Sequence, residues 1–137
     1  MKHTHILPLL LIVCAALLAG CAPKQAAAPA VVPEGGHQAE GMADCEVPAD
    51  ASSYTVLVQV TTDAHGAITD ARDAGTSVPP KHESKHRQAL ALLDTLPGRT
   101  LDTLGDVDAV SGATDSSKAL LAAVEQALEA IRADSGQ

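Results

Sequence analysis

The clearest alternation of hydrophobic and polar positions lies at residues 54–62, Tyr-Thr-Val-Leu-Val-Gln-Val-Thr-Thr. Every second residue is Tyr or Val until the end of the run, which predicts a strand with one buried face. A turn containing Gly66 follows, and residues 67–74 predict a weaker second strand. Ile68 and Ala71 break its alternation, which favours a β-bulge. Together the two segments predict an antiparallel hairpin.

Later segments have the spacing of amphipathic helices. Residues 81–96 follow Pro79-Pro80 and precede Pro97-Gly98, which are suitable residues for a helix start and stop. Apolar residues three apart at 101–110 predict a helical turn. Residues 118–132 have the strongest pattern and are expected to pack on the hairpin, because a two-stranded ribbon is marginally stable alone. The apolar stripe of this last helix is Leu120, Leu121, Val124, Leu128 and Ile131.

The first 44 residues lack this periodicity. Residues 1–20 have a positive start at Lys2 and an apolar run, as in a secretory signal peptide. Prolines, glycines and alanines without a period predict a flexible tether at 21–44. The folded part is therefore expected at 45–137. Its predicted class is α+β, a small antiparallel sheet with a β-hairpin core packed against two or three helices.

The apolar run ends in Leu18-Ala19-Gly20-Cys21. This string resembles the lipobox of bacterial lipoproteins, in which the cysteine is diacylated and becomes the mature N-terminus; the alternative is an ordinary signal peptide. Two or three acyl chains give a stable anchor. The resemblance implies a protein tethered through Cys21 to a membrane of the bacterial envelope, outside the cytoplasm. Ala22, in place of the aspartate of many inner-membrane lipoproteins, favours the outer membrane where there are two.

Composition excludes several functions. The formal net charge is −8 and no basic stripe is present, which argues against nucleic-acid binding. Cys14 leaves with the signal and Cys21 would be lipidated, so Cys45 has no disulfide partner in the mature chain. The sequence has no Cys-x-x-Cys-His motif for covalent haem.

Residues 108–117, Asp-Ala-Val-Ser-Gly-Ala-Thr-Asp-Ser-Ser, lead into the last helix. The first amide N–H groups of a helix lack intrahelical partners and attract phosphate. Gly112 and Ala113 would let a ligand approach the backbone. From the residues alone, a cap formed by Thr114 or Ser116 is the favoured interpretation. The hydroxyls available for capping, phosphate binding or covalent modification belong to Ser111, Thr114, Ser116 and Ser117.

The order of parts at residues 54–128 resembles the FMN-binding domain of the flavin-carrying subunits of sodium-pumping NADH:quinone reductases and Rnf-type complexes. In that family the threonine at the position of Thr114 carries FMN through a phosphodiester bond, which an exported flavin transferase forms from FAD. The resemblance implies covalent FMN on Thr114, with Asp108 in the transferase recognition signature and Ser116 and Ser117 beside the cofactor. The motif residues that match are Asp108, Ser111, Gly112, Ala113 and Thr114.

Two features depart from the family pattern. Many relatives have a glycine in the turn before the first strand, and Asp50-Ala51-Ser52-Ser53-Tyr54 has none. The chain has one aromatic residue of the Phe, Trp and Tyr type, so Tyr54 or aliphatic side chains would have to cover the isoalloxazine ring.

His82 and His86 lie four residues apart on the predicted helix at 81–96, a spacing that can ligate a metal. No third ligand is evident, so a solvated helix face is the favoured interpretation and no metal is assigned. The surrounding basic residues are an alternative contact for a redox partner or the flavin phosphate. These residues are Lys81, Lys85 and Arg87.

The implied function is that of a membrane-tethered extracytoplasmic electron carrier and not of a self-contained enzyme. Its expected partners are the flavin transferase, the membrane and redox proteins. The alternative is a non-redox binding or envelope-structure lipoprotein with the same fold, no flavin and Thr114 as a helix cap.

Overall fold

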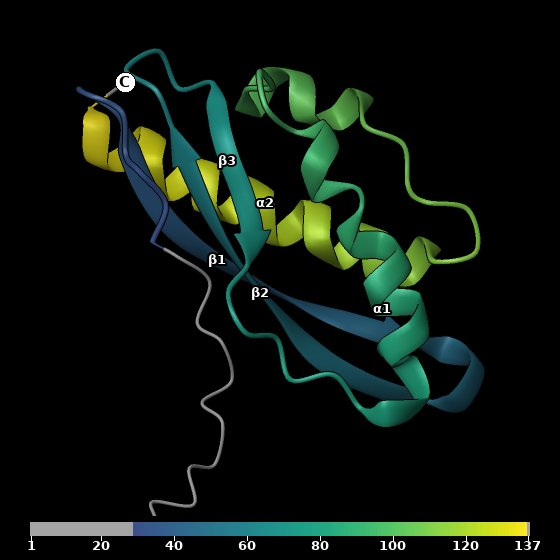
Figure 1. The fold of residues 1–137 in the computed structure, drawn as a ribbon. Coiled ribbons are helices and arrows are strands. Elements are labelled where there is room, and N and C mark those ends of the chain that lie inside the picture. Colours follow the sequence, from purple (N-terminus) through teal and green to yellow (C-terminus); the bar gives the residue numbers. More distant parts are fainter. Residues whose placement is uncertain (1–28, 137) are drawn as a thin grey trace, which may run out of the picture.

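The computed structural model of the protein describes residues 29–136. The predicted signal peptide and Cys21 lie outside them. Three antiparallel strands form one sheet in the order β1-β2-β3: β1 (His37–Val47), β2 (Ser52–Thr62) and β3 (Ile68–Asp73). The helices are α1 (Glu83–Leu90) and α2 (Thr114–Ser135), with short 3-10 helices η1 (Pro48–Asp50), η2 (Pro80–His82), η3 (Leu93–Thr95) and η4 (Leu101–Asp106). Figure 1 shows α2 running along the sheet, with α1 beside it. The predicted α+β class is confirmed.

The predicted hairpin is β2 and β3. Its expected irregularity is confirmed, because the register shifts at Thr61/Thr62, where Thr62 pairs with Ile68 and Thr61 with Asp70. The helix predicted at 81–96 is divided into η2, α1 and η3. The last helix begins at Thr114, four residues before the predicted start at residue 118, because its first turn faces polar partners and lacks the apolar stripe.

Strand β1 corrects the predicted tether. Residues 37–47 pair with β2 along the whole strand, so the expected start of the folded part at residue 45 is wrong. The period of two is present in the sequence, but the residues that face the helix are small. They are Ala39, Gly41, Ala43, Cys45 and Val47. Such residues give a weak hydrophobic signal, which is why the strand was not predicted.

Small residues in β1 let α2 lie almost against its backbone. A Cβ on Gly41 would stand 1.9 Å from the carbonyl oxygen of Ala123 and 2.9 Å from the amide nitrogen of Ala127. The N–H of Met42 donates to Oε1 of Gln126 at 2.6 Å. A helix side chain thus satisfies a backbone donor of this edge strand, where unpaired N–H groups invite pairing with other chains.

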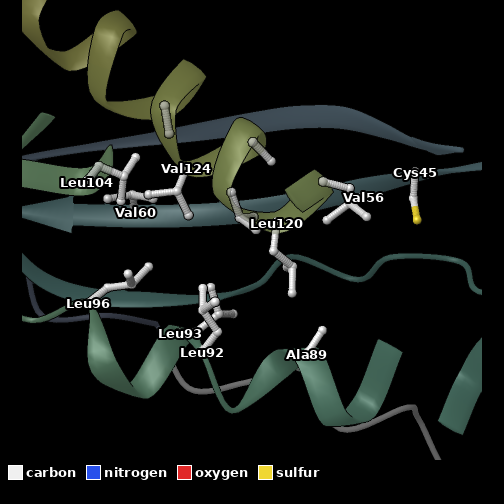
Figure 2. Packing of buried hydrophobic residues seen from close by; sticks show 14 of the residues in the cluster. Cys45, Val56, Val60, Ala89, Leu92, Leu93, Leu96, Leu104, Leu120 and Val124 are labelled. Carbon is white, nitrogen blue, oxygen red and sulfur yellow. The ribbon is translucent and has the colours of Figure 1, made fainter. Parts of the chain in front are cut away.

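The hydrophobic core lies between the sheet and the helices. Val56, Val58 and Val60 of β2 have no exposed surface, and burial of each such side chain is worth about 1.5–3 kcal/mol. Figure 2 shows Leu120 and Val124 of α2 meeting this face, with Leu92, Leu93 and Leu96 closing the core from the α1 side. The predicted stripe of α2 is buried except for Leu121, which is half-buried.

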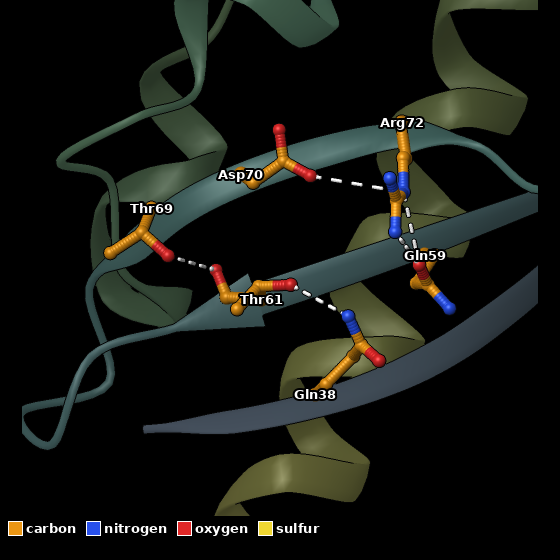
Figure 3. A network of polar contacts seen from close by, with 6 residues as sticks. All are labelled: Gln38, Gln59, Thr61, Thr69, Asp70 and Arg72. Atoms are coloured by element: carbon orange, nitrogen blue, oxygen red, sulfur yellow. Dashed lines mark hydrogen bonds and ion pairs between the residues drawn. The ribbon is translucent and has the colours of Figure 1, made fainter. Parts of the chain in front are cut away.

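The opposite face of the sheet carries a polar network. Nε2 of Gln38 donates to Oγ1 of Thr61 at 3.0 Å, and Nε of Arg72 donates to Oε1 of Gln59 at 2.9 Å (Figure 3). The carboxylate of Asp70 lies 3.9 Å from Nε of Arg72. These contacts link all three strands on the side of the sheet away from α2.

None of the helices within residues 29–136 has the length and apolarity that crossing a membrane requires.

We predict that Gly41→Ala lowers the free energy of unfolding by about 3 kcal/mol, because the added methyl group cannot fit between β1 and α2. Urea denaturation measures the change. Gly105→Ala is the matched control, since a Cβ there meets no atom within 4 Å. Equal stability of the two variants would contradict the close contact between β1 and α2.

Candidate functional site at the start of helix α2

The turn before α2 is held by its own backbone. The N–H of Ala113 donates to the carbonyl oxygen of Val110 at 3.0 Å. Gly112 has a φ of +82°, a left-handed conformation that favours glycine. The helix starts at the next-but-one residue, Thr114, whose side chain is exposed together with those of Asp108 and Ser111.

Helix α2 begins without a side-chain cap. Its N-cap residue is Ala113, so the predicted cap by Thr114 or Ser116 is wrong. The first N–H with an intrahelical acceptor is that of Ser117, which donates to the carbonyl oxygen of Ala113 at 2.9 Å. Within the described chain, the amide N–H groups of residues 114–116 have no backbone carbonyl acceptor in the helix. They leave a partial positive charge at the mouth of the helix.

The hydroxyls of Ser116 and Ser117 are buried and occupied by other partners. Oγ of Ser117 accepts the N–H of Val110 at 3.0 Å and donates to the carbonyl oxygen of Ala113 at 2.8 Å. Oγ of Ser116 lies 3.0 Å from the hydroxyl oxygen of Tyr54. These two serines fix the turn, while the hydroxyls of Ser111 and Thr114 face outward.

His82 and His86 are buried, which corrects the predicted solvated helix face. The ring of His82 stacks on that of Tyr54 with centroids 5.9 Å apart, and the ring of His86 meets it edge-on at 5.6 Å. Nδ1 of His86 lies 3.3 Å from the hydroxyl oxygen of Tyr54. Tyr54 therefore joins the start of α2, through Ser116, to helix α1.

Burial controls the ionisation of this cluster. It raises the pKa of Tyr54 to about 12, so the hydroxyl keeps its proton at neutral pH. Burial also lowers the pKa of His86, although the negative charge of Asp73 acts to raise it. Nε2 of His86 is buried without a hydrogen-bond partner in the described structure, and a proton added there would be poorly solvated.

A second polar group anchors the segment before α1. Nε2 of His82 lies 2.8 Å from Oγ of Ser52 and 3.4 Å from Oδ2 of Asp50, and Nζ of Lys81 lies 2.7 Å from the same Oδ2. Hydrogen bonds from Lys81 and Ser52 lower the pKa of Asp50 to about 2. Between Asp50 and Ser52, Ala51 has a φ of +52°, a left-handed conformation that favours glycine.

A small cavity of about 30 Å³ lies at Thr114. It is lined by the turn and first residues of α2, by His82 and Lys85, and by Val47 at the end of β1. Cavities of about 490 Å³ beside His86 and about 200 Å³ beside His37 do not include Thr114. The cavity has room for about two water molecules, which suits a phosphate group and is too little for a three-ring flavin.

The donor set of this cavity fits the phosphate end of FMN. Free amides, the exposed hydroxyl of Thr114 and the ammonium of Lys85 are groups that bind phosphate oxygens. The flavin ring would lie outside the cavity. Tyr54 is only 7% exposed and is covered by His82, so the aromatic ring that lines the site is the imidazole of His82 and not the phenol of Tyr54.

The sequence indicated a contact of Lys85 with the flavin phosphate only as an alternative, and it did not indicate that His82 lies beside Thr114. Their spacing puts them on one side of a helix, but nothing in the sequence indicates that this side meets Gly112. Within residues 29–136, no cluster of three or more His, Cys, Asp or Glu side chains could hold a metal ion.

The fold and site define a small α+β domain with a small cavity at the uncapped start of its last helix. The model of the FMN-binding domain family matches residues 52–129, from the start of β2 into the last turns of α2, and the chain belongs to this family. The domain is therefore a flavin-binding one. Searches among curated proteins and among solved structures found no match.

We predict that the pH dependence of stability contains a contribution from His86. Because its pKa is lower in the folded state than the unfolded value of 6.5, the unfolded chain binds the proton more readily. Stability is thus lost as the pH falls below 6.5. In urea denaturation at pH 8 and pH 5, His86→Gln should lose less stability between the two pH values than the wild type. His65→Gln, in the exposed turn, is the control and should keep the pH dependence of the wild type. The same pH dependence in His86→Gln would contradict a contribution from His86.

Proposed function

We propose that the protein is a membrane-tethered extracytoplasmic electron carrier that holds FMN covalently on Thr114 through a phosphodiester bond. The observation that carries the proposal is the position of Thr114. It is the first residue of α2, exposed, beside uncapped amides and a phosphate-sized cavity, in a chain of the FMN-binding domain family.

Attachment is a transfer from FAD by a flavin transferase. Oγ1 of Thr114 forms the new bond to the phosphorus of the FMN half, the phosphoanhydride bond of FAD breaks, AMP leaves, and the hydroxyl proton passes to a base of the transferase. The single negative charge that remains on the diester lies at the helix start, where the amides of residues 114–116 and the helix dipole stabilise it. Bound FMN supplies one- and two-electron exchange.

The small size of the cavity supports a covalent link. A ring system that lies outside the cavity buries little surface, so noncovalent contacts alone would hold FMN weakly. A phosphodiester bond retains the cofactor in a compartment from which free FMN diffuses away. Ser111, Gly112 and Ala113 shape the turn beneath the phosphate, and Asp108 remains part of the proposed recognition signature.

The proposed location rests on residues 1–28. The string Leu18-Ala19-Gly20-Cys21 supports export and lipidation at Cys21. Because a hydrogen-bonded turn at residues 33–36 packs against Thr62 before β1 begins, the proposed tether is limited to residues 22–32, with a reach of roughly 20 Å for a flexible chain. Such a reach suits a carrier that meets redox partners close to the membrane surface.

We predict that co-expression of the mature protein with a flavin transferase adds the mass of FMN minus one water, and that Thr114→Ala abolishes this addition. Thr114→Ser keeps an attacking hydroxyl and should be modified more slowly. Ser135→Ala removes a hydroxyl at the opposite end of α2 and should be modified like the wild type. Intact-mass spectrometry and in-gel fluorescence after denaturation give the readout. A flavin that stays on Thr114→Ala after denaturation would contradict attachment at Thr114. An unmodified wild type would favour the alternative, a binding protein without flavin.

A further inference from the structure

Helix α1 forms the wall of the Thr114 cavity that faces the start of α2. His82 and Lys85 line the cavity, and Oε1 of Gln88, one turn later, lies 3.9 Å from where a Cβ of Gly112 would be. The three residues are spaced by three and therefore share one side of the η2–α1 segment. This side approaches the turn that carries Thr114.

Lys85 is the cation that this wall brings to the site. Lys81, also in the basic segment, is paired with Asp50 at 2.7 Å. Arg87 lines the cavity of about 490 Å³ together with His86 and Leu90, and not the one at Thr114. Within the described residues, Lys85 has no carboxylate within ion-pair distance. Its charge is thus available to a ligand.

The charges around the cavity favour such a cation. Asp115 lines the same cavity, and its carboxylate repels an incoming phosphate. The helix dipole is equivalent to roughly half an elementary charge, which is less than the full charge of a carboxylate. An ammonium in the opposite wall restores a favourable field for an anion.

We infer that Lys85 is a positioning residue for the flavin phosphate, a role that rests on the proposed attachment to Thr114. Its ammonium holds the phosphate oxygens across the cavity from the helix amides, so that the phosphorus lies against Oγ1 of Thr114. The bond that forms is Oγ1–P, the bond that breaks is the phosphoanhydride of FAD, AMP leaves, and the hydroxyl proton goes to the transferase.

The test compares rates of covalent attachment with purified transferase and FAD, followed by intact-mass spectrometry. Lys85→Gln should reduce the rate at least about tenfold, as expected for loss of a hydrogen bond to a charged group, and Lys85→Arg should restore most of it. Arg87→Gln removes the same charge from the same helix on its other side and should stay within about twofold of the wild type. Thermal melting checks that all variants are folded.

A second readout uses the flavin-free protein and inorganic phosphate. Phosphate should shift the amide resonances of residues 114–116 in NMR spectra of the wild type and of Arg87→Gln, and these shifts should weaken in Lys85→Gln. The inference is overturned by equal attachment rates in the wild type and Lys85→Gln, by an equal loss in Arg87→Gln, or by unchanged phosphate shifts in Lys85→Gln. A wild type that accepts no flavin would instead overturn the proposed function.

Discussion

The structure depends on the contact between helix α2 and strand β1 at Gly41. The missing side chain brings the backbones of the strand and of Ala123 together, and Gln126 then reaches the N–H of Met42. Because α2 is a single helix of 22 residues, its position against β1 also sets where its first residue, Thr114, lies. A packing contact far along the helix thereby fixes the site.

The second constraint is the buried polar junction centred on Tyr54. Its hydroxyl contacts Ser116 at the start of α2 and His86 of α1, while His82 stacks on its ring. Buried hydrogen bonds of this kind are costly to break, since each leaves an unsatisfied group in the interior. The junction therefore holds α1 at a set distance from α2, and the narrow cavity between them, with Lys85 in its wall, follows from it.

The sequence predicted those elements of the fold whose residues follow a clear local pattern. The Val pattern of β2 and the leucine stripe of α2 each follow one period, and the motif ending at Thr114 lies at a helix start as expected. Strand β1 was missed because Gly41 and its small neighbours let α2 pack closely but give little hydrophobic signal. The burial of His82 and His86 arises from their contact with Tyr54, some thirty residues away, which no local pattern encodes.

The central claim is that Oγ1 of Thr114 is bonded to phosphorus, and ³¹P NMR of the flavin-loaded protein tests it most directly. A phosphodiester has no ionisation near neutrality, whereas the phosphate of noncovalent FMN has a second pKa near 6. The account predicts one protein-borne resonance that does not move between about pH 5 and pH 8. A resonance that titrates in this interval, or that is lost on dialysis after unfolding, would contradict it.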